Sequence, residues 1–393
     1  MAVRPPRSGA LLIAPCIPNP SGTGWEKRLH ALVQAYARFG GVDLWCQPTI
    51  DHPDLSPLFE SPELYASIQV FYPSLLFSNE YYLGSALTAA IARASLVHVF
   101  RLSEIAAVID HPLVIWDLDE LAREVRDPRR NPGTAAGLDP ALSARRADVL
   151  EIASRCRRLL VSSAVEVEPW IRPRPEVMPN AVAFPERFQP HWREQDQTLL
   201  FVGNFNFPPN VAAVEVLLEE IWPRLRSARP ALCLRLAGRG PRDPALAAWL
   251  VRQQERGGLE LIFDPPEIEA CYRGARLSLC PLLEGGGTRL KIIEAFAMGC
   301  PVVSTSIGAE GLDVVDQEHL LIADDPVRFA ESCLRLLAEL PLAHRLAERA
   351  FAHAALVHDQ GAIEARLATL LRGLGWPPAL QAGRSGALPG AGA

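Results

Sequence analysis

The chain has 393 residues, of which 49% are hydrophobic and 21% are charged, and its formal net charge is −6. This length allows two or three domains, and the composition excludes wholesale disorder, which requires few apolar residues and high charge. The acidic balance excludes a general nucleic-acid coat or a strongly basic membrane binder, although a local basic patch is compatible with it.

The first half of the chain alternates short apolar runs with amphipathic stretches. Apolar residues at helical spacing predict a helix over 26–39, and a second helix is expected over 139–156. Strands that alternate with helices are typical of a parallel sheet covered on both faces. The expected strands of this half are 10–14, 42–46, 96–100, 113–116 and 159–162.

Six prolines between Pro169 and Pro190 interrupt this periodicity and indicate a connection between domains. The alternation then restarts, so the sequence predicts an α/β protein with two doubly wound halves, each binding ligands beyond the carboxyl ends of its strands. The expected strands are 198–202, 232–237, 259–263, 277–281, 301–304 and 320–322. The expected helices are 211–225, 244–255, 267–275, 289–298, 327–339, 342–358 and 361–374.

These patterns divide the chain into five parts. We expect an N-terminal domain over 1–182, a linker over 183–197 and a C-terminal domain over 198–358. A helix over 359–374 is compatible with a return to the N-terminal domain. The tail 375–393 is rich in proline, glycine and alanine, so we expect it to be disordered.

The eight cysteines include no C-x-x-C pair, so no zinc or redox motif is visible, and their apolar surroundings are typical of free thiols in a reducing cytosol. The apolar stretch 10–14 ends at Pro15 and is too short for an export signal. No segment has the ~20 apolar residues of a membrane span. We therefore expect a cytoplasmic protein, with peripheral contact to the inner face of the membrane as an open alternative.

A glycine run between a predicted strand and a predicted helix is the richest segment of the chain. Gly285, Gly286 and Gly287 allow a ligand to approach backbone N–H groups, and Thr288 is expected to cap the helix. A helix N-terminus behind such a loop binds anions. Arg289 and Lys291 add positive charge there. Regular helical positions two apart point about 200° apart, so we expect only one of them, Arg289, to reach the anion.

Glu294 lies one to two turns into the same helix and is a candidate acceptor for two ribose hydroxyls. The alternative is an ordinary capped helix with a surface salt bridge between Lys291 and Glu294.

The loop PNPSGTGWEKR, residues 18–28, follows the first predicted strand. Gly22 and Gly24 allow close approach of a phosphate, but the third glycine of a dinucleotide fingerprint is missing. A flexible turn explains the loop equally well, and Arg28 could simply extend from the helix to solvent.

Several motifs together resemble the glycosyltransferase family 4 (group 1) enzymes. The C-terminal half carries the stronger resemblance, in FVGNFNFPPN (201–210), LAGRGP (236–241), GGGTRLKIIEAFAMGCPVVST (285–305) and GAEGL (308–312). The N-terminal half fits more loosely, through the Gly22/Gly24 loop, HVFR (98–101), DLDE (117–120) and MPNAV (178–182). The resemblance implies the GT-B fold, in which two Rossmann-like domains face a central cleft, with the acceptor on the N-terminal side and the nucleotide-sugar held mainly by the C-terminal domain.

The resemblance also implies roles for individual residues. It assigns catalysis to Arg289, Lys291 and Asp119, ribose binding to Glu294, and the acceptor side to Arg101 and Asp117. The residues implied for the donor diphosphate and sugar are Gly22, Gly24, Gly203, Asn204, Gly286, Gly287 and Thr288.

Two departures from the family pattern concern the donor. Many members carry two glutamates eight positions apart, and the first would fall at Gly286, while Glu284 lies two residues earlier. In the family this position often touches the donor sugar, so the sequence leaves the identity of that sugar open. Many members also place cations where this chain has the neutral Asn204 and Asn210, so Arg289 and Lys291 are expected to supply the charge.

Asp117 and Asp119 form a D-x-D motif, which binds Mg²⁺ or Mn²⁺ in the other glycosyltransferase fold. Capping of the following helix and contact with a substrate are the alternatives to metal binding. His98 lies on an apolar strand and is expected to be a packed core residue. The aromatic stretch 65–82 is expected in the core, with sugar or membrane contact as alternatives.

The resemblance thus implies a retaining hexosyltransferase that needs no metal and no cofactor, with a nucleotide-sugar as co-substrate. The acceptor is a sugar, a lipid-linked molecule or a small molecule, in polysaccharide, glycolipid or glycoconjugate biosynthesis, and no nucleic acid is involved. The alternatives are a non-catalytic nucleotide-binding protein of the same fold and a nucleotide-sugar epimerase.

Overall fold

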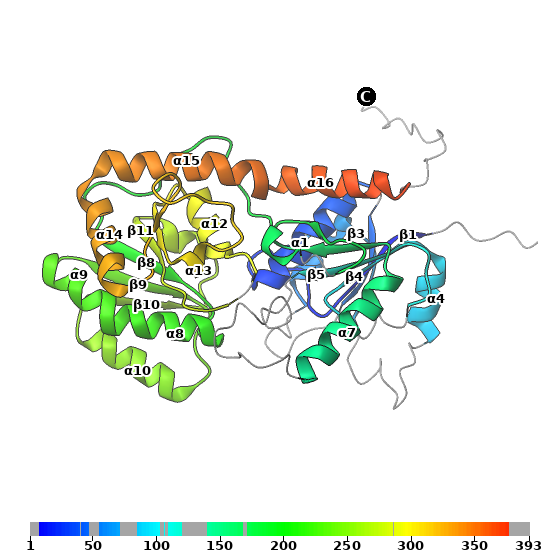
Figure 1. The fold of residues 1–393 in the computed structure, drawn as a ribbon, viewed down its shortest axis with the longest axis horizontal. Coiled ribbons are helices and arrows are strands. Elements are labelled where there is room, and N and C mark those ends of the chain that lie inside the picture. The colour runs from blue at the N-terminus through cyan, green and yellow to red at the C-terminus, as the bar shows by residue number, and fades with distance from the viewer. Residues whose placement is uncertain are drawn as a thin grey trace, which may run out of the picture.

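The computed structural model describes residues 8–39, 41–46, 55–70, 85–102, 106, 109–119, 140–167, 171–285 and 287–376. Two separate parallel sheets lie side by side, one in each half of the chain, with helices packed around both (Figure 1). This arrangement confirms the predicted α/β class with two doubly wound units facing each other.

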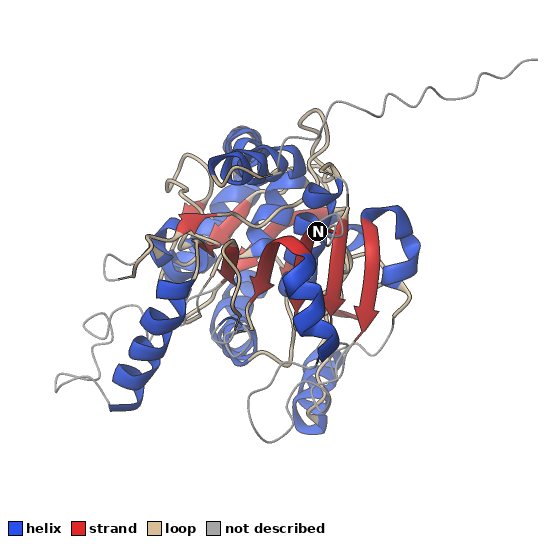
Figure 2. Cartoon of the chain, turned by 90° about the vertical axis from the view of Figure 1, so that its right-hand side faces the viewer, coloured by secondary structure: helices blue, strands red, loops and turns tan. Residues whose placement is uncertain are grey.

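The N-terminal sheet has the strand order β3-β2-β1-β4-β5-β6-β7, and all its neighbouring strands pair in parallel. Figure 2 shows this sheet with helices on both of its faces. Its strands are β1 (Ser8–Ala14), β2 (Val42–Cys46), β3 (Tyr65–Val70), β4 (Ala94–Phe100), β5 (Val114–Asp119), β6 (Arg158–Val161) and β7 (Glu176–Val177). The helices of this half are α1 (Gly24–Ala37), α2 (Pro57–Glu60), η1 (Pro62–Leu64), α4 (Ser85–Arg93), α7 (Pro140–Arg155) and η3 (Ala164–Glu166).

The aromatic stretch 65–82 only partly forms core. Its first six residues are the edge strand β3, which the sequence analysis did not predict and whose residues are half-buried or exposed. Alternation of polar and apolar residues is a weak sequence signal for a strand at the edge of a sheet, because such a strand has a neighbouring strand on only one side. The rest of the stretch, residues 71–82, lies outside the described residues.

The C-terminal sheet has the order β10-β9-β8-β11-β12-β13, again with parallel neighbours throughout. Its strands are β8 (Thr198–Val202), β9 (Cys233–Gly238), β10 (Leu259–Phe263), β11 (Ala275–Cys280), β12 (Val302–Ser304) and β13 (Leu321–Ile322). The helices that follow them are α8 (Pro208–Val216), η4 (Leu217–Ile221), α9 (Trp222–Ala228), α10 (Pro244–Glu255), α11 (Glu269–Tyr272), α12 (Leu290–Ala297), α13 (Ser306–Ala309), α14 (Pro326–Ala338), α15 (Leu340–His358) and α16 (Gln360–Gly373).

Two helices of this half differ from their predicted extent. The stretch 211–225 is one continuous helical segment, but a π-helical turn, η4, interrupts it and ends two residues before Pro223. Proline lacks the N–H that a regular α-helix requires, and a π turn accommodates this loss. The helix expected over 267–275 ends at Tyr272, because Gly274 adopts φ +72° and the chain turns into β11.

The last helix returns to the first half of the chain. Helix α15 runs along the C-terminal half, and α16 continues along the N-terminal half (Figure 1). Ile363, Leu367 and Leu371 of α16 belong to the apolar core that also contains Leu32 and Tyr36 of α1. The chain therefore passes between the two halves twice, and the residues at these crossings touch: Val182 N–H donates to the His358 carbonyl at 2.9 Å.

Among the described residues, no helix combines the length and apolar character that crossing a membrane requires. All eight cysteines are free thiols, and seven of them are buried.

The order of the strands positions a site. Successive strands are added to the sheet in one direction before, and in the opposite direction after, the β1–β4 boundary in one sheet and the β8–β11 boundary in the other. In doubly wound sheets, ligands bind at this switch point, beyond the carboxyl ends of the strands. The loops that follow these strands in the two halves lie opposite each other and enclose one cleft.

Candidate functional site

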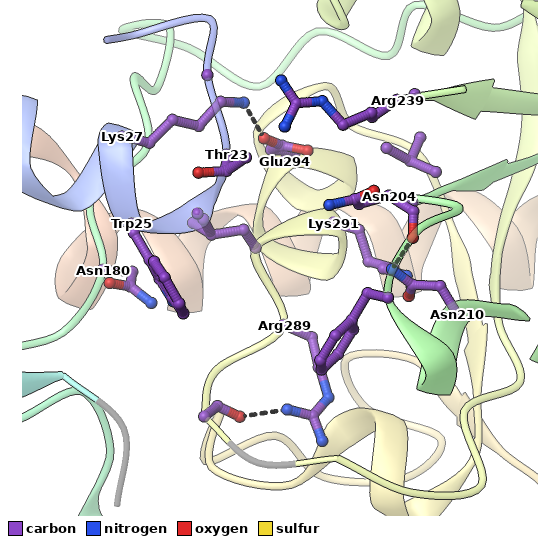
Figure 3. Close-up of a pocket in the computed structure, with 18 of the residues that line it drawn as sticks. Thr23, Trp25, Lys27, Asn180, Asn204, Asn210, Arg239, Arg289, Lys291 and Glu294 are labelled. Atoms are coloured by element: carbon purple, nitrogen blue, oxygen red, sulfur yellow. Dashed lines mark hydrogen bonds and ion pairs between the residues drawn. The ribbon is translucent and has the colours of Figure 1, made fainter. Parts of the chain in front are cut away.

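A cleft of about 650 Å³ lies between the two halves. One wall is formed by the loop after β1 and the start of α1, together with Asp119 and Asn180. The other is formed by the loops after β8, β9, β10 and β11 and the start of α12. Three helices, α1, α8 and α12, thus begin at the cleft, where their N–H groups and positive dipole ends favour an anion. Figure 3 shows the side chains that point into it.

Close backbone packing forms the C-terminal wall. Gly238, at the end of β9, adopts φ +126°, and a Cβ there would lie 2.1 Å from the carbonyl oxygen of Gly203. Only glycine allows these two loops to touch. Gly285 adopts φ +123°, a conformation that side chains disfavour. Gly238 and Gly285 are therefore needed for the backbone shape of this wall.

The start of α12 differs from the prediction. The helix begins at Leu290 with Arg289 as its N-cap residue, and the hydroxyl of Thr288 does not cap it. Instead, the Thr288 hydroxyl accepts a hydrogen bond of 2.5 Å from the side chain of Asn180, which lies at the crossing between the halves. The predicted cap is therefore wrong, and Thr288 connects the glycine loop to the N-terminal half.

Arg289 holds the glycine loop. Its guanidinium donates to the carbonyl oxygens of Gly287 at 2.7 Å and Ile307 at 3.4 Å, and the side chain is almost buried (Figure 3). Arg289 lines the cleft, but these hydrogen-bond donors are already used by the protein.

Lys291 also lines the cleft, contrary to the expectation that only one of the two cations would reach it. The 200° argument fails because Arg289 has ψ 89° and precedes the helix, so its direction is not set by helical geometry. The Lys291 ammonium donates to Asn210 Oδ1 at 2.7 Å and lies 4.4 Å from the centre of the Phe201 ring. Burial lowers the pKa of Lys291 to about 8.

Glu294 pairs with a residue from the opposite wall. Its Oε1 accepts a hydrogen bond of 2.5 Å from the ammonium of Lys27, on α1, and its Oε2 accepts one of 3.2 Å from the Tyr272 hydroxyl (Figure 3). The surface pair between Lys291 and Glu294 is therefore not formed. Glu294 is only 7% exposed, and its ion pair joins the two halves across the cleft.

The loop after β1 is held by a short contact at the start of α1. The backbone N–H of Thr23 donates to the Glu26 carboxylate at 2.6 Å, and Gly22 and Gly24 lie on the cleft wall. Trp25 projects into the cleft and is 45% exposed (Figure 3). The Arg101 guanidinium lies 3.6 Å from the centre of the indole ring and so supports one face of it.

Asp117 does not face the cleft. It is fully buried and accepts two hydrogen bonds of 3.0 Å from Arg28, which is itself buried rather than extended to solvent. Burial alone would raise the pKa of Asp117, but Arg28 and then His98 outweigh it and lower this pKa to about 2. His98, also buried, bonds the Tyr36 hydroxyl at 2.9 Å, as a core residue does. The acceptor-side role predicted for Asp117 does not fit this position.

Asp119 lies on the cleft wall at the end of β5, with φ +58°. Its carboxylate accepts a 2.9 Å hydrogen bond from Arg101 and lies 3.3 Å from Arg28 Nε. Burial raises the pKa of Asp119, although both arginines act in the opposite direction. Arg101 also has a positive φ, +63°, so two strained residues are joined here, which is a pattern that occurs at functional sites.

In the part of the chain that the structure describes, no three His, Cys, Asp or Glu side chains form a group that could hold a metal ion. The D-x-D carboxylates of Asp117 and Asp119 are instead engaged by Arg28 and Arg101. The alternative that Asp117 or Asp119 caps a following helix stays a prediction, because residues 120–139 lie outside the described residues.

Most residues singled out from the sequence meet in this one cleft. The described residues that line it are Gly22, Gly24, Asp119, Gly203, Asn204, Gly287, Thr288, Arg289, Lys291 and Glu294. Arg101 lies behind Trp25, Asp117 lies below the wall, and Gly286 lies outside the described residues.

Among the cleft-lining residues that sequence reasoning did not single out are Trp25, Lys27, Asn180 and Arg239. Lys27 and Trp25 follow the Gly22/Gly24 loop directly, so a loop read as a phosphate site could have drawn attention to them. Asn180 lies in the MPNAV hinge, but nothing in the sequence predicts its contact with Thr288.

Comparisons with known proteins agree with this geometry. Residues 196–339 match the family Glycosyl transferases group 1. An uncharacterized 44.6 kDa protein in the cps region of Klebsiella pneumoniae is 31% identical over 158 residues, and the match spans 39% of this chain and about 40% of that protein.

Two solved structures share the fold over nearly their whole length. Sucrose-phosphate synthase from Thermosynechococcus elongatus has a TM-score of 0.68 at 17% identity, covering 93% of this chain and 99% of that one. Anabaena HepE, solved with UDP-glucose, has a TM-score of 0.68 at 14% identity, covering 93% and 99%. The chain thus has the GT-B fold of these structures, and its residues 196–339 are similar to the group 1 glycosyltransferases.

Proposed function

We propose that the protein is a nucleotide-sugar-dependent glycosyltransferase that transfers a hexose to an acceptor hydroxyl with retention of configuration. One observation carries this proposal: the switch-point loops of both sheets face a single cleft whose C-terminal wall belongs to the group 1 glycosyltransferase domain. An activated sugar and a second substrate can meet in such a cleft with water excluded.

The donor diphosphate would lie against the glycine loop and the start of α12. Fixed N–H groups and the cations Arg289 and Lys291 line this region. Transfer breaks the bond between the sugar carbon and the phosphate oxygen, so negative charge develops on the leaving diphosphate. Positive charge and aligned dipoles that are already in place stabilise this charge in the transition state.

The acceptor would approach from the N-terminal wall, where Trp25, Arg101 and Asp119 lie together. In a front-face reaction the leaving phosphate oxygen takes the proton of the acceptor hydroxyl, so no protein nucleophile is required. We propose that Asp119 orients the acceptor and that the reaction needs no metal ion. A sugar, lipid-linked or small-molecule acceptor, a role in glycoconjugate synthesis, and a cytoplasmic location stay predictions from the sequence.

The two alternatives from the sequence differ in what they do to the donor. A nucleotide-sugar epimerase would convert donor in the absence of acceptor. A non-catalytic protein would bind nucleotide and leave the donor intact. The neutral Asn204 and Asn210 favour the second, since they replace cations, but Lys291 binds Asn210 and supplies a cation at that place.

The test is thermal melting against UDP-, GDP-, ADP- and TDP-sugars, with Mg²⁺ or with EDTA. UDP-glucose comes first because HepE was solved with it. We expect one base to raise the melting temperature equally in both buffers, since a ligand at a hundredfold excess over its Kd adds about 2.7 kcal/mol of stability.

Product analysis by mass spectrometry then follows, with a mixture of sugar and lipid-linked acceptors. Transfer in EDTA supports the proposal. Donor converted without acceptor would favour the epimerase, donor bound but never consumed would favour the non-catalytic protein, and no shift with any nucleotide-sugar would contradict a donor site in this cleft.

A further inference from the structure

The cations at the cleft differ in what they already bind. Among the described residues, the cations that line it are Lys27, Arg239, Arg289 and Lys291. Arg289 donates to the carbonyl oxygens of its own loop, and Lys291 donates to Asn210 while packed over Phe201. Two of the cations expected to hold a diphosphate are therefore committed to holding the wall itself.

Lys27 differs from these two because it comes from the opposite wall. It extends from the first turn of α1, on the N-terminal half, and its ammonium binds Glu294 on α12 of the C-terminal half (Figure 3). The side chain of Lys27 is 14% exposed and that of Glu294 is 9% exposed, so little water reaches the pair. Burial lowers the pKa of Lys27 and the Glu294 carboxylate raises it by more, so the ammonium is charged at neutral pH.

This ion pair and a bound nucleotide would compete for the same carboxylate. Glu294 already receives a hydrogen bond from Tyr272 on Oε2 and the Lys27 ammonium on Oε1. A ribose diol that donates to Glu294 must reach a carboxylate that Lys27 now covers. Once displaced, Lys27 would be a poorly hydrated cation without a partner, which is costly in a cleft.

A diphosphate supplies the missing partner. In a nucleoside diphosphate the first phosphate is attached directly to the ribose, so it enters the cleft beside the carboxylate that holds the ribose. Lysine has a long flexible stem and a point charge, which suit an exchange between two nearby anions.

We propose that Lys27 is a diphosphate-binding residue supplied by the N-terminal half. Donor binding transfers its ammonium from Glu294 to the diphosphate and frees Glu294 for the ribose. No covalent bond is made or broken in this exchange, and the charges stay paired before and after it. The inference rests on the proposed function and adds to it the residue through which α1 contacts the donor. The inference predicts that loss of the Lys27 charge weakens binding of a nucleoside diphosphate but does not weaken binding of the matching nucleoside.

The experiment measures binding of UDP and of uridine by calorimetry to the wild type, Lys27→Met and Lys27→Arg at one ionic strength. GDP with guanosine, ADP with adenosine and TDP with thymidine are tested in the same way. We expect Lys27→Met to weaken diphosphate binding by about 10-fold to 100-fold, the range for a charge-assisted hydrogen bond. The matching nucleoside should bind at least as tightly as to the wild type, because Glu294 is then uncovered. Lys27→Arg should keep most of the diphosphate affinity.

Arg38→Met is the matched control. Arg38 follows α1 and pairs with Glu364 of α16 outside the cleft, so its loss removes an ion pair of the same helix without touching the site. We expect unchanged binding of both ligands to Arg38→Met, and a single cooperative thermal transition of the free Lys27 variants will show that they fold.

Three results would overturn the inference. Unchanged diphosphate affinity in Lys27→Met would show that the ammonium never reaches the phosphates. Equal weakening of diphosphate and nucleoside would show that Lys27 only holds Glu294 in place, and strengthening of both would show a simple competitor. If the wild type binds none of the four diphosphates and none of the four nucleosides, the proposed function and the inference about Lys27 both fail.

Discussion

The cations in and beside the cleft differ in whether a carboxylate balances their charge before any ligand arrives. Lys27 is paired with Glu294 and Arg101 with Asp119, while Lys291 relies on a neutral amide. Lys291 is therefore the member of this group whose charge is least supported, and burial lowers its pKa to about 8. The ammonium is charged below that pH and neutral above it.

This difference predicts a pH dependence of binding. If the Lys291 charge attracts the diphosphate, affinity is full near pH 7 and falls by about tenfold by pH 9, the loss expected from a group with a pKa near 8. Lys27 does not contribute to the fall, because its pKa is raised. Calorimetric titration of UDP at pH 7, 8 and 9 measures this.

Lys291→Met should bind more weakly at pH 7 and should show little change up to pH 9. A fall of the same size in the variant would assign the pH dependence to another group.

At the scale of single elements, helix α1 is fixed by its buried face. Arg28 donates to both carboxylate oxygens of Asp117 on β5, to the Met178 carbonyl at 2.6 Å and to Asn180 at 3.1 Å. These bonds connect α1 with the strand behind it and with the crossing between the halves. The same turn of α1 carries Lys27, so the buried Arg28 places Lys27 at the cleft.

Loss of this arginine should destabilise the fold. Arg28→Met leaves Asp117 buried without its cation, and breaking such a pair costs about 3–5 kcal/mol. Urea unfolding followed by tryptophan fluorescence measures the change.

Arg335→Met is the comparison, since Arg335 pairs with Glu339 on an exposed helix face, where a pair contributes about 0.3–0.5 kcal/mol. Equal losses in the two variants would show that the buried pair does not stabilise α1.

At the scale of the whole molecule, the place where the chain crosses between the two halves contains a buried histidine, His358. His358 ends α15, is 4% exposed, and bonds the Asn180 carbonyl through Nδ1 at 2.8 Å. Burial lowers the pKa of His358 to about 4, although the hydrogen bond to Asn180 acts the other way. The unfolded chain has the ordinary value near 6.5, so it binds a proton in this interval and the folded chain does not.

Stability is therefore lost as pH falls from about 6.5 toward 4. Between pH 7 and pH 5 the His358 contribution to the free energy of unfolding should decrease by about 2 kcal/mol. His358→Gln has no such proton, so its unfolding free energy should fall by that much less over the same interval. Urea titrations of both proteins at pH 7, 6 and 5 give the two slopes, and parallel slopes would contradict a buried neutral histidine.

Much of this arrangement could be predicted from the sequence, because it depends on local patterns. Alternating apolar runs and amphipathic stretches specify two parallel α/β units, since a strand buried on both faces must be apolar throughout. The glycine run after β11 indicates an anion site, because it allows a ligand to approach backbone N–H groups. The candidate residues Lys291 and Glu294 were found from the helix that follows this run, and Asp119 from the D-x-D motif and the family resemblance; all three line the cleft.

The tertiary structure alone decided which charged and polar side chains pair with each other in the cleft. Lys27 and Glu294 are 267 positions apart, and Asn180 and Thr288 are 108 apart. No period or spacing relates such positions, because their contact depends on how the two sheets face each other. Packing of α1 against the N-terminal sheet buried Asp117 and left Asp119 on the wall, although the two lie on one strand with a single residue between them. The sequence by itself determined two sheets and their ligand-binding loops, and the packing of one half on the other determined the pairing of the charges in the cleft.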